Sequence, residues 1–212
     1  MEYTGVRQED WETGWKAYYH AMDIGTRLAV VPSWEAYETD RAVITLDPGM
    51  PSAPARTRPR PCRLETLDGL VKGGERVLDI GTGSGILAIA ALKLGAAKAE
   101  GVDIDRCACA RQAKTRPSMA CRTTLRYWWA TFPKRPRVYD VICANIVANA
   151  IIHLVPNVPA LLAKHGTFLA SGIIDTRKDE VIAAVQAAGL ALREVKEKNG
   201  WVALVCGHTG RE

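Results

Sequence analysis

The chain has 212 residues, 48% apolar and 24% charged, which is typical of a soluble globular protein with one main domain and a short extension. No apolar run reaches the roughly 20 residues that cross a bilayer, and neither end carries a secretory pattern, so we expect a cytoplasmic protein without membrane contact. The net charge of +5 comes from two acid-free segments, 51–64 and 106–139. Elsewhere 15 basic residues face 23 acidic ones, which argues against a nucleic-acid partner.

The six cysteines show no paired C-x-x-C spacing, so we predict free thiols and no metal site. They are Cys62, Cys107, Cys109, Cys121, Cys143 and Cys206. None of the four histidines lies in a motif, and the sequence names no general base.

The first 50 residues predict a linker region. Aromatic residues at helical spacing favour an amphipathic helix over 8–20, and two β-rich runs predict strands at 27–31 and 42–46. Four prolines between 51 and 61 then predict an irregular loop. Residues 51–212 are expected to form the main domain.

The main domain alternates strands and helices, which predicts a mostly parallel sheet covered on both faces. A short helix from residue 64 comes first. Strands are expected at 76–80, 99–102, 138–143 and 167–171, and helices at 85–94, 148–164 and 176–188. Two final strands, 190–195 and 201–205, flank Asn199-Gly200, a type I′ turn signal that predicts an antiparallel hairpin.

The run VLDIGTGSGIL, from Val77 to Leu87, is an apolar strand that passes through a glycine turn into a helix. Glycines such as Gly81 and Gly83 permit positive φ and let a ligand approach the backbone, at the sheet edge where doubly wound folds bind ligands. A glycine turn alone can also be purely structural. Asp103, 22 residues after Gly81 and at the end of the next strand, adds an acid suited to ribose hydroxyls.

Together these residues indicate an adenosine-containing cofactor. The third glycine, Gly85, follows the second by two residues, which departs from the dinucleotide fingerprint and favours S-adenosylmethionine over NAD. Asn145 follows a strand and is expected at the same edge, near the transferring methyl group or its acceptor. An asparagine in that place is also a common turn former.

Several segments carry a specific resemblance: LDIGTGSGILAIAALKLGA, GVDID, YDVICANIVAN and FLASGI, with upstream DWETGWKAYYH and ITLDPGM, and NGWVALV near the end. They are similar to the bacterial ribosomal protein L-eleven methyltransferase family. The resemblance implies a class I methyltransferase fold, doubly wound (Rossmann-like) and α/β, with a seven-stranded sheet. It also implies S-adenosyl-L-methionine as cofactor, contacts at Gly81, Gly83, Asp103 and Asn145, and lysine and N-terminal amines of ribosomal protein L-eleven as substrate. We expect a monomer.

Two segments, 51–62 and 106–125, depart from the family. After Met50 the family continues AFGTGTHPTT, a loop that closes over the cofactor, and Arg60 stands where its last threonine contacts it. Deleting one guanine from codons for that text yields residues 51–60 of this chain one for one. We therefore hypothesise two compensated frameshifts. The chain also starts near the linker, so the family's amino-terminal docking domain is expected to be absent.

Two other functions remain open. The glycine turn and Asp103 are shared by class I methyltransferases of other proteins or small amines. The altered segments and the missing docking domain fit a non-catalytic remnant that keeps the fold. Cofactor affinity separates the remnant from both enzymes.

Overall fold

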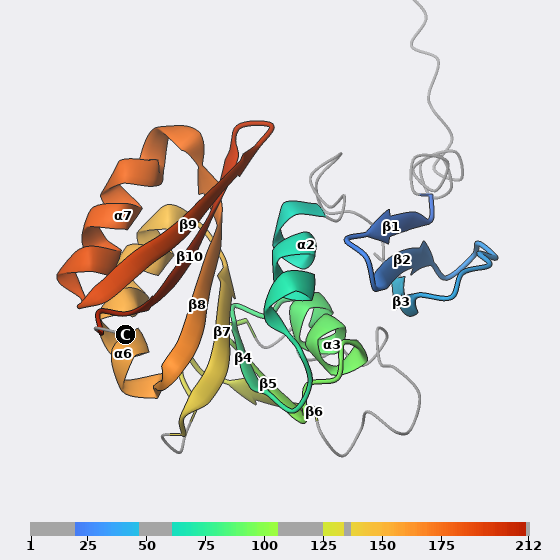
Figure 1. Ribbon diagram of the computed structural model, residues 1–212, viewed down its shortest axis with the longest axis horizontal. Coiled ribbons are helices and arrows are strands. Elements are labelled where there is room, and N and C mark those ends of the chain that lie inside the picture. Colours follow the sequence, from blue (N-terminus) through green and yellow to red (C-terminus); the bar gives the residue numbers. More distant parts are fainter. Residues whose placement is uncertain (1–19, 47–60, 106–124, 134–136, 211–212) are drawn as a thin grey trace, which may run out of the picture.

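The computed structural model describes residues 20–46, 61–105, 125–133 and 137–210. They form a large central sheet with helices on both faces and a small second sheet beside it (Figure 1). The predicted helix at 8–20, apart from its last residue, and nearly all of the two altered segments lie outside the described residues. Within the described part of the chain, no helix is long and apolar enough to cross a membrane.

The central sheet has seven strands in the order β6-β5-β4-β7-β8-β10-β9. The strands are β4 (Arg76–Ile80), β5 (Lys98–Asp103), β6 (Leu125–Trp129), β7 (Tyr139–Asn145), β8 (Leu162–Ile174), β9 (Leu190–Lys198) and β10 (Trp201–His208). From β6 to β8 all neighbours pair in parallel, while β10 is antiparallel to both β8 and β9. The predicted α/β fold with a mostly parallel sheet is therefore confirmed.

The predicted hairpin joins β9 to β10. Asn199 and Gly200 both have positive φ, 53° and 74°, as a type I′ turn requires. Lys198 and Trp201 pair directly across the turn. The Asn-Gly signal therefore predicted the turn correctly.

Helices cover the two faces of the sheet (Figure 1). On one face lie α2 (Pro61–Leu70) and α3 (Ile86–Lys93), and on the other α5 (Ala148–Leu154), α6 (Val158–Leu161) and α7 (Lys178–Ala187). Successive strand residues point to opposite faces, so Val77 joins the core under α2 and α3, whereas Leu78 joins the core under α5 and α7. Two hydrophobic cores, one on each face, result.

The segment predicted as one helix over 148–164 is divided. A 3₁₀ turn, Val155–Asn157, separates α5 from α6, and β8 already begins at Leu162. Pro156 and Pro159 stand in the first turns of these short pieces, where the missing N–H costs little, but neither can continue the preceding helix. The 13-residue β8 extends well beyond the predicted 167–171. Strand β6 lies in a region where no strand was predicted.

A three-stranded sheet precedes the central sheet in the chain: β1 (Met22–Ile24), β2 (Leu28–Pro32) and β3 (Ala42–Leu46). Strands β2 and β3 match the predicted pair, and β1 is additional. Ile24, Leu28 and Ile44 are buried in the same core as Leu64 and Leu67 of α2. The small sheet is thus packed against the helix layer by shared apolar burial.

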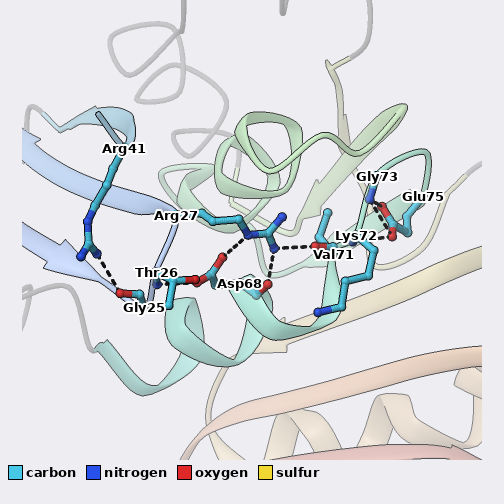
Figure 2. Close-up of polar contacts among 9 residues, drawn as sticks. All are labelled: Gly25, Thr26, Arg27, Arg41, Asp68, Val71, Lys72, Gly73 and Glu75. Carbon is cyan, nitrogen blue, oxygen red and sulfur yellow. Dashed lines mark hydrogen bonds and ion pairs between the residues drawn. The ribbon is translucent and has the colours of Figure 1, made fainter. Parts of the chain in front are cut away.

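A polar contact fixes the same junction (Figure 2). The Asp68 carboxylate, only 6% exposed, accepts hydrogen bonds from Thr26 N at 2.7 Å and Oγ1 at 3.1 Å, and from Arg27 Nε at 2.8 Å. Arg27 also donates to the carbonyls of Asp68 and of Val71, the latter at 2.6 Å. The guanidinium therefore satisfies free carbonyls at the end of α2 while it pairs with the acid.

Two cysteines, Cys143 and Cys206, are buried free thiols, as predicted. Burial raises the pKa of both, that of Cys206 to about 12, so neither is activated as a nucleophile. The side chains of the other four cysteines lie outside the described residues.

Asp68 generates a prediction for stability. Burial alone would raise its pKa, but the hydrogen bonds from Thr26 and Arg27 outweigh burial and lower the pKa below 3.8. The stabilisation is therefore present above pH 4 and is lost as the pH falls through the lowered folded-state pKa. We expect Asp68→Asn to lower the free energy of unfolding by about 2 kcal/mol at pH 7, with a smaller difference at pH 3, in urea denaturation.

Asp23→Asn is the matched control, because Asp23 pairs with Arg41 at 3.4 Å on the same linker but is 41% exposed. It should cost under about 0.5 kcal/mol. Equal losses in the two variants would contradict the role assigned to Asp68.

Candidate active site

Three predicted site segments meet at one edge of the central sheet. Strands β5 and β7 flank β4 in parallel, with Ile80 opposite Val102 on one side and Ala144 on the other. The glycine turn follows β4, while Asp103 and Asn145 are the last residues of β5 and β7. Parallel pairing therefore brings the predicted residues to a common carboxyl edge, where open α/β sheets bind ligands.

Backbone hydrogen bonds attach the glycine turn to β5. The N–H groups of Gly81 and Thr82 both donate to the Val102 carbonyl, at 2.8 and 3.1 Å, and Gly85 N–H donates to the Thr82 carbonyl at 2.8 Å. Gly81, Gly83 and Gly85 have φ of 69°, 53° and 79°, which strongly favour glycine. The turn is thus fixed beside Asp103.

The three glycines differ in what surrounds them. A side chain at Gly81 would collide with Ile146, and one at Gly85 with the Tyr127 ring. At Gly83 the nearest described atom to an added Cβ is the Gly81 carbonyl oxygen, at 4.0 Å. Among the described residues, Gly83 is therefore the least crowded of the three glycines.

The Asp103 carboxylate accepts backbone hydrogen bonds from two sides. Its Oδ2 accepts from Gly83 N–H at 2.9 Å, and its Oδ1 accepts from Asp105 N–H at 2.9 Å. A carboxylate oxygen has two lone pairs, so each oxygen keeps one that can accept from a hydroxyl. Two adjacent ribose hydroxyls match this pattern.

Asn145 is held from the neighbouring strand. Ser171 Oγ on β8 donates to Asn145 Oδ1 at 3.1 Å, and Ile146 N–H donates to the Ser171 carbonyl at 3.1 Å. The pair Asn145 and Ser171 is in direct register. The amide NH₂ and one lone pair of Oδ1 remain for a ligand.

Asp79 is a site residue that our reading of the sequence did not assign. It is 1% exposed, and its carboxylate accepts from Thr82 Oγ1 at 2.7 Å. Burial raises its pKa to about 6, although hydrogen bonds from Thr82 and from the Ala88 backbone oppose the shift. Asp79 therefore ties β4 to the glycine turn and to the first turn of α3. Its signal was an acid inside an otherwise apolar strand.

The residues at this edge fit S-adenosylmethionine: a glycine turn, a carboxylate with spare lone pairs at Asp103, and an amide at Asn145. With the strand order and terminal hairpin, they define the fold of class I S-adenosylmethionine-dependent methyltransferases. The family model of Ribosomal protein L11 methyltransferase (PrmA) matches residues 1–209. The chain belongs to this family.

Curated relatives named ribosomal protein L11 methyltransferase agree. The chain is 39% identical to one from Desulforamulus reducens over 204 residues, which cover 95% of this chain and 66% of the relative. One from Symbiobacterium thermophilum is 40% identical and shares 94% and 66% of the two lengths. The chain therefore spans slightly less than two thirds of these relatives.

Solved structures give the same fold. The ribosomal protein L11 methylase of Lactobacillus delbrueckii subsp. bulgaricus superposes with a TM-score of 0.80 at 26% identity, over 91% of this chain and all of that one. A methyltransferase from Listeria monocytogenes, at 15% identity and a TM-score of 0.57, covers 70% of this chain and 98% of its own, and supports the fold alone.

Asp79 generates a prediction with a defined sign. Its folded pKa of about 6 exceeds the ordinary value of 3.8, so the stability present below pH 4 is lost as the pH rises through 6. Asn at position 79 cannot ionise. Between pH 4 and pH 7 we expect the free energy of unfolding of Asp79→Asn to rise by roughly 3 kcal/mol relative to that of the native chain. Urea denaturation at several pH values measures this difference.

Glu75→Gln is a control of opposite sign. Burial alone would raise the pKa of Glu75, but the N–H groups of Lys72 and Gly73 outweigh burial and lower the pKa (Figure 2). Its variant should become less stable relative to the native chain as the pH rises from below 4 to about 4.5, the ordinary pKa, and the difference should then stay constant. A difference for Asp79→Asn that stays constant from pH 4 to 7 would contradict a buried carboxylate that titrates near 6.

Proposed function

We propose that this chain is the catalytic part of an enzyme that transfers methyl groups from S-adenosylmethionine to lysine and N-terminal amines of ribosomal protein L11. The single observation that carries the proposal is the meeting of Gly83, Asp103 and Asn145 at one sheet edge in a member of this family. We propose a cytoplasmic monomer, with no nucleic acid as a direct partner.

In this proposal each residue at the edge has a task. The Gly81–Gly83 backbone lies against the cofactor, Asp103 accepts from the ribose hydroxyls, and Asn145 lies beside the reacting groups. When bound, the cofactor supplies a methyl group on a sulfonium, which an amine can take by in-line attack. The protein contributes position and partial exclusion of water.

The acceptor must arrive as a neutral amine, since an ammonium ion has no lone pair for attack. Two exposed apolar side chains stand at this edge, Val147 at 69% and Ile174 at 43% exposed. Val147 lies two residues after the end of β7, the strand that carries Asn145, and Ile174 is the last residue of β8, the strand that carries Ser171. An apolar entrance lowers the pKa of an entering ammonium and favours its deprotonation. No general base is assigned.

A specific observation favours a second candidate. Segment 51–62 does not carry the text of the family's cofactor loop. A non-catalytic remnant would keep the described fold and lose the activity. A class I methyltransferase of another protein or a small amine is the third possibility.

The test is methyl transfer to purified ribosomal protein L11, followed by mass spectrometry of the intact substrate and its peptides. We expect increments of one methyl group on lysine or the N-terminal amine. Asn145→Ala should slow the reaction about a hundredfold, because misplacement of reacting groups costs that much. Asn157→Ala is the control, since the one described hydrogen bond of the Asn157 side chain goes to the Leu154 carbonyl and not to a residue of the site.

The outcomes separate the candidates. Methylation by a version with 51–62 and 106–125 restored to the family's text, but not by this chain, would identify a remnant. Transfer to other amines but not to L11 would indicate a different methyltransferase.

A further inference from the structure

The strand beside Asn145 contributes a buried hydroxyl at the same edge. β7 and β8 run parallel with Asn145 directly opposite Ser171. Their side chains point to one face, because Cys143 and Leu169, two residues before each, belong to the same core. Ser171 is 4% exposed, and its Oγ lies 3.1 Å from Asn145 Oδ1. We propose that Ser171 is a positioning residue, whose hydroxyl sets the orientation of the Asn145 amide for methyl transfer.

The backbone supports this role. The Ser171 carbonyl also accepts from Ile146 N–H at 3.1 Å, so one residue holds both the Asn145 side chain and the following peptide. On the next position Gly172 has φ of 83°, and a Cβ there would lie 2.8 Å from the Ile146 carbonyl and 3.3 Å from Asn145 Oδ1. The Ile146 side chain in turn fills the space beside Gly81. The Asn145–Ile146 segment is therefore enclosed between two glycines.

The orientation of the amide has chemical consequences. The terminal torsion of asparagine is broad and roughly two-fold, so without a partner the plane of the amide is not fixed relative to the acceptor. The Ser171 O–H donates to Asn145 Oδ1. The second lone pair of Oδ1 then remains for an N–H of the incoming amine. An amine held through its N–H keeps its own lone pair for the methyl group. A reversed amide would instead donate Nδ2–H to that lone pair and block the attack.

This inference rests on the proposed function, because it assumes that Asn145 lies beside the acceptor amine. It goes further by assigning Ser171 a role through Asn145 rather than through direct contact with substrate. A merely structural Ser171 would affect stability alone. The experiment therefore needs one readout of Asn145 itself and one of the reaction.

The first readout is the side-chain amide of Asn145 in ¹⁵N-labelled protein without ligand, assigned by its absence from Asn145→Ala. In Ser171→Ala we expect its resonances to shift and its order parameter to fall. Ser171→Thr, which keeps the hydroxyl, should restore both. Thr167→Val is the matched control, since it removes a hydroxyl from the same strand that faces Arg193 at 3.5 Å instead.

The second readout is kinetic. Ser171→Ala should lower kcat about tenfold, the worth of one hydrogen bond, and leave the KM values for cofactor and acceptor within about twofold. In the Asn145→Ala background the same change should have no further effect on kcat, because Ser171 acts through Asn145.

The outcomes are distinguishable. If the native chain methylates nothing, the proposed function fails, and the amide resonances still decide whether Ser171 holds Asn145. Unchanged resonances in Ser171→Ala would overturn the inference. So would a kcat loss that persists in full when Asn145 is already alanine.

Discussion

The Val102 carbonyl accepts hydrogen bonds from both Gly81 and Thr82, and this contact fixes the glycine turn to the end of β5. Asp103, the next residue, then reaches Gly83 N–H at 2.9 Å. Without that attachment the glycine turn would lose its direct backbone contact with β5, and Gly83 would not be held beside Asp103. The parallel pairing of β4 with β5 and β7 extends the same constraint to Asn145.

Buried polar groups around this edge are satisfied in pairs, which makes the site rigid but costs desolvation. The buried Asp79 accepts from Thr82, and Ser171 donates to Asn145. Farther away, Tyr139 donates to the buried Glu100 at 2.8 Å, and Asp68 receives Arg27. Each pair joins two elements that are distant in sequence or two neighbouring parts of the site. The polar contacts and the two apolar cores therefore stabilise the same arrangement of strands and helices.

Local patterns predicted much of this arrangement. The apolar run into a glycine turn located β4 and the site, and Asn199-Gly200 located the hairpin. The predicted helix over 148–164 is divided in the structure at Pro156 and Pro159. The sequence did not reveal this because the helical spacing of apolar residues continues through both prolines. Strand β6 lay in a segment without a readable pattern. Residues 51–62, where the family's loop would stand, lie almost wholly outside the described residues.

The polar partners were harder to predict. Ser171 and Asp79 act through partners on other strands or turns, and a single sequence does not reveal cross-strand register. The sequence predicted Ser171 only as the last residue of a strand. Its place beside Asn145 follows from the pairing of β8 with β7. In the sequence Asp79 was part of the glycine motif and received no role of its own. Its burial and the hydrogen bond that it accepts from Thr82 are visible only in the structure.

The central claim is that the described sheet edge is itself a cofactor site. Calorimetric titration of the 212-residue chain with S-adenosylmethionine tests it most directly, beside Asp103→Ala and a version with both altered segments restored. We expect saturable one-site binding by this chain, weaker than by the restored version and lost in Asp103→Ala. Binding by the restored version alone, with this chain folded but unable to bind S-adenosylmethionine, would contradict a cofactor site at the described edge. Residues 51–62 and 106–125 would then determine whether the cofactor binds.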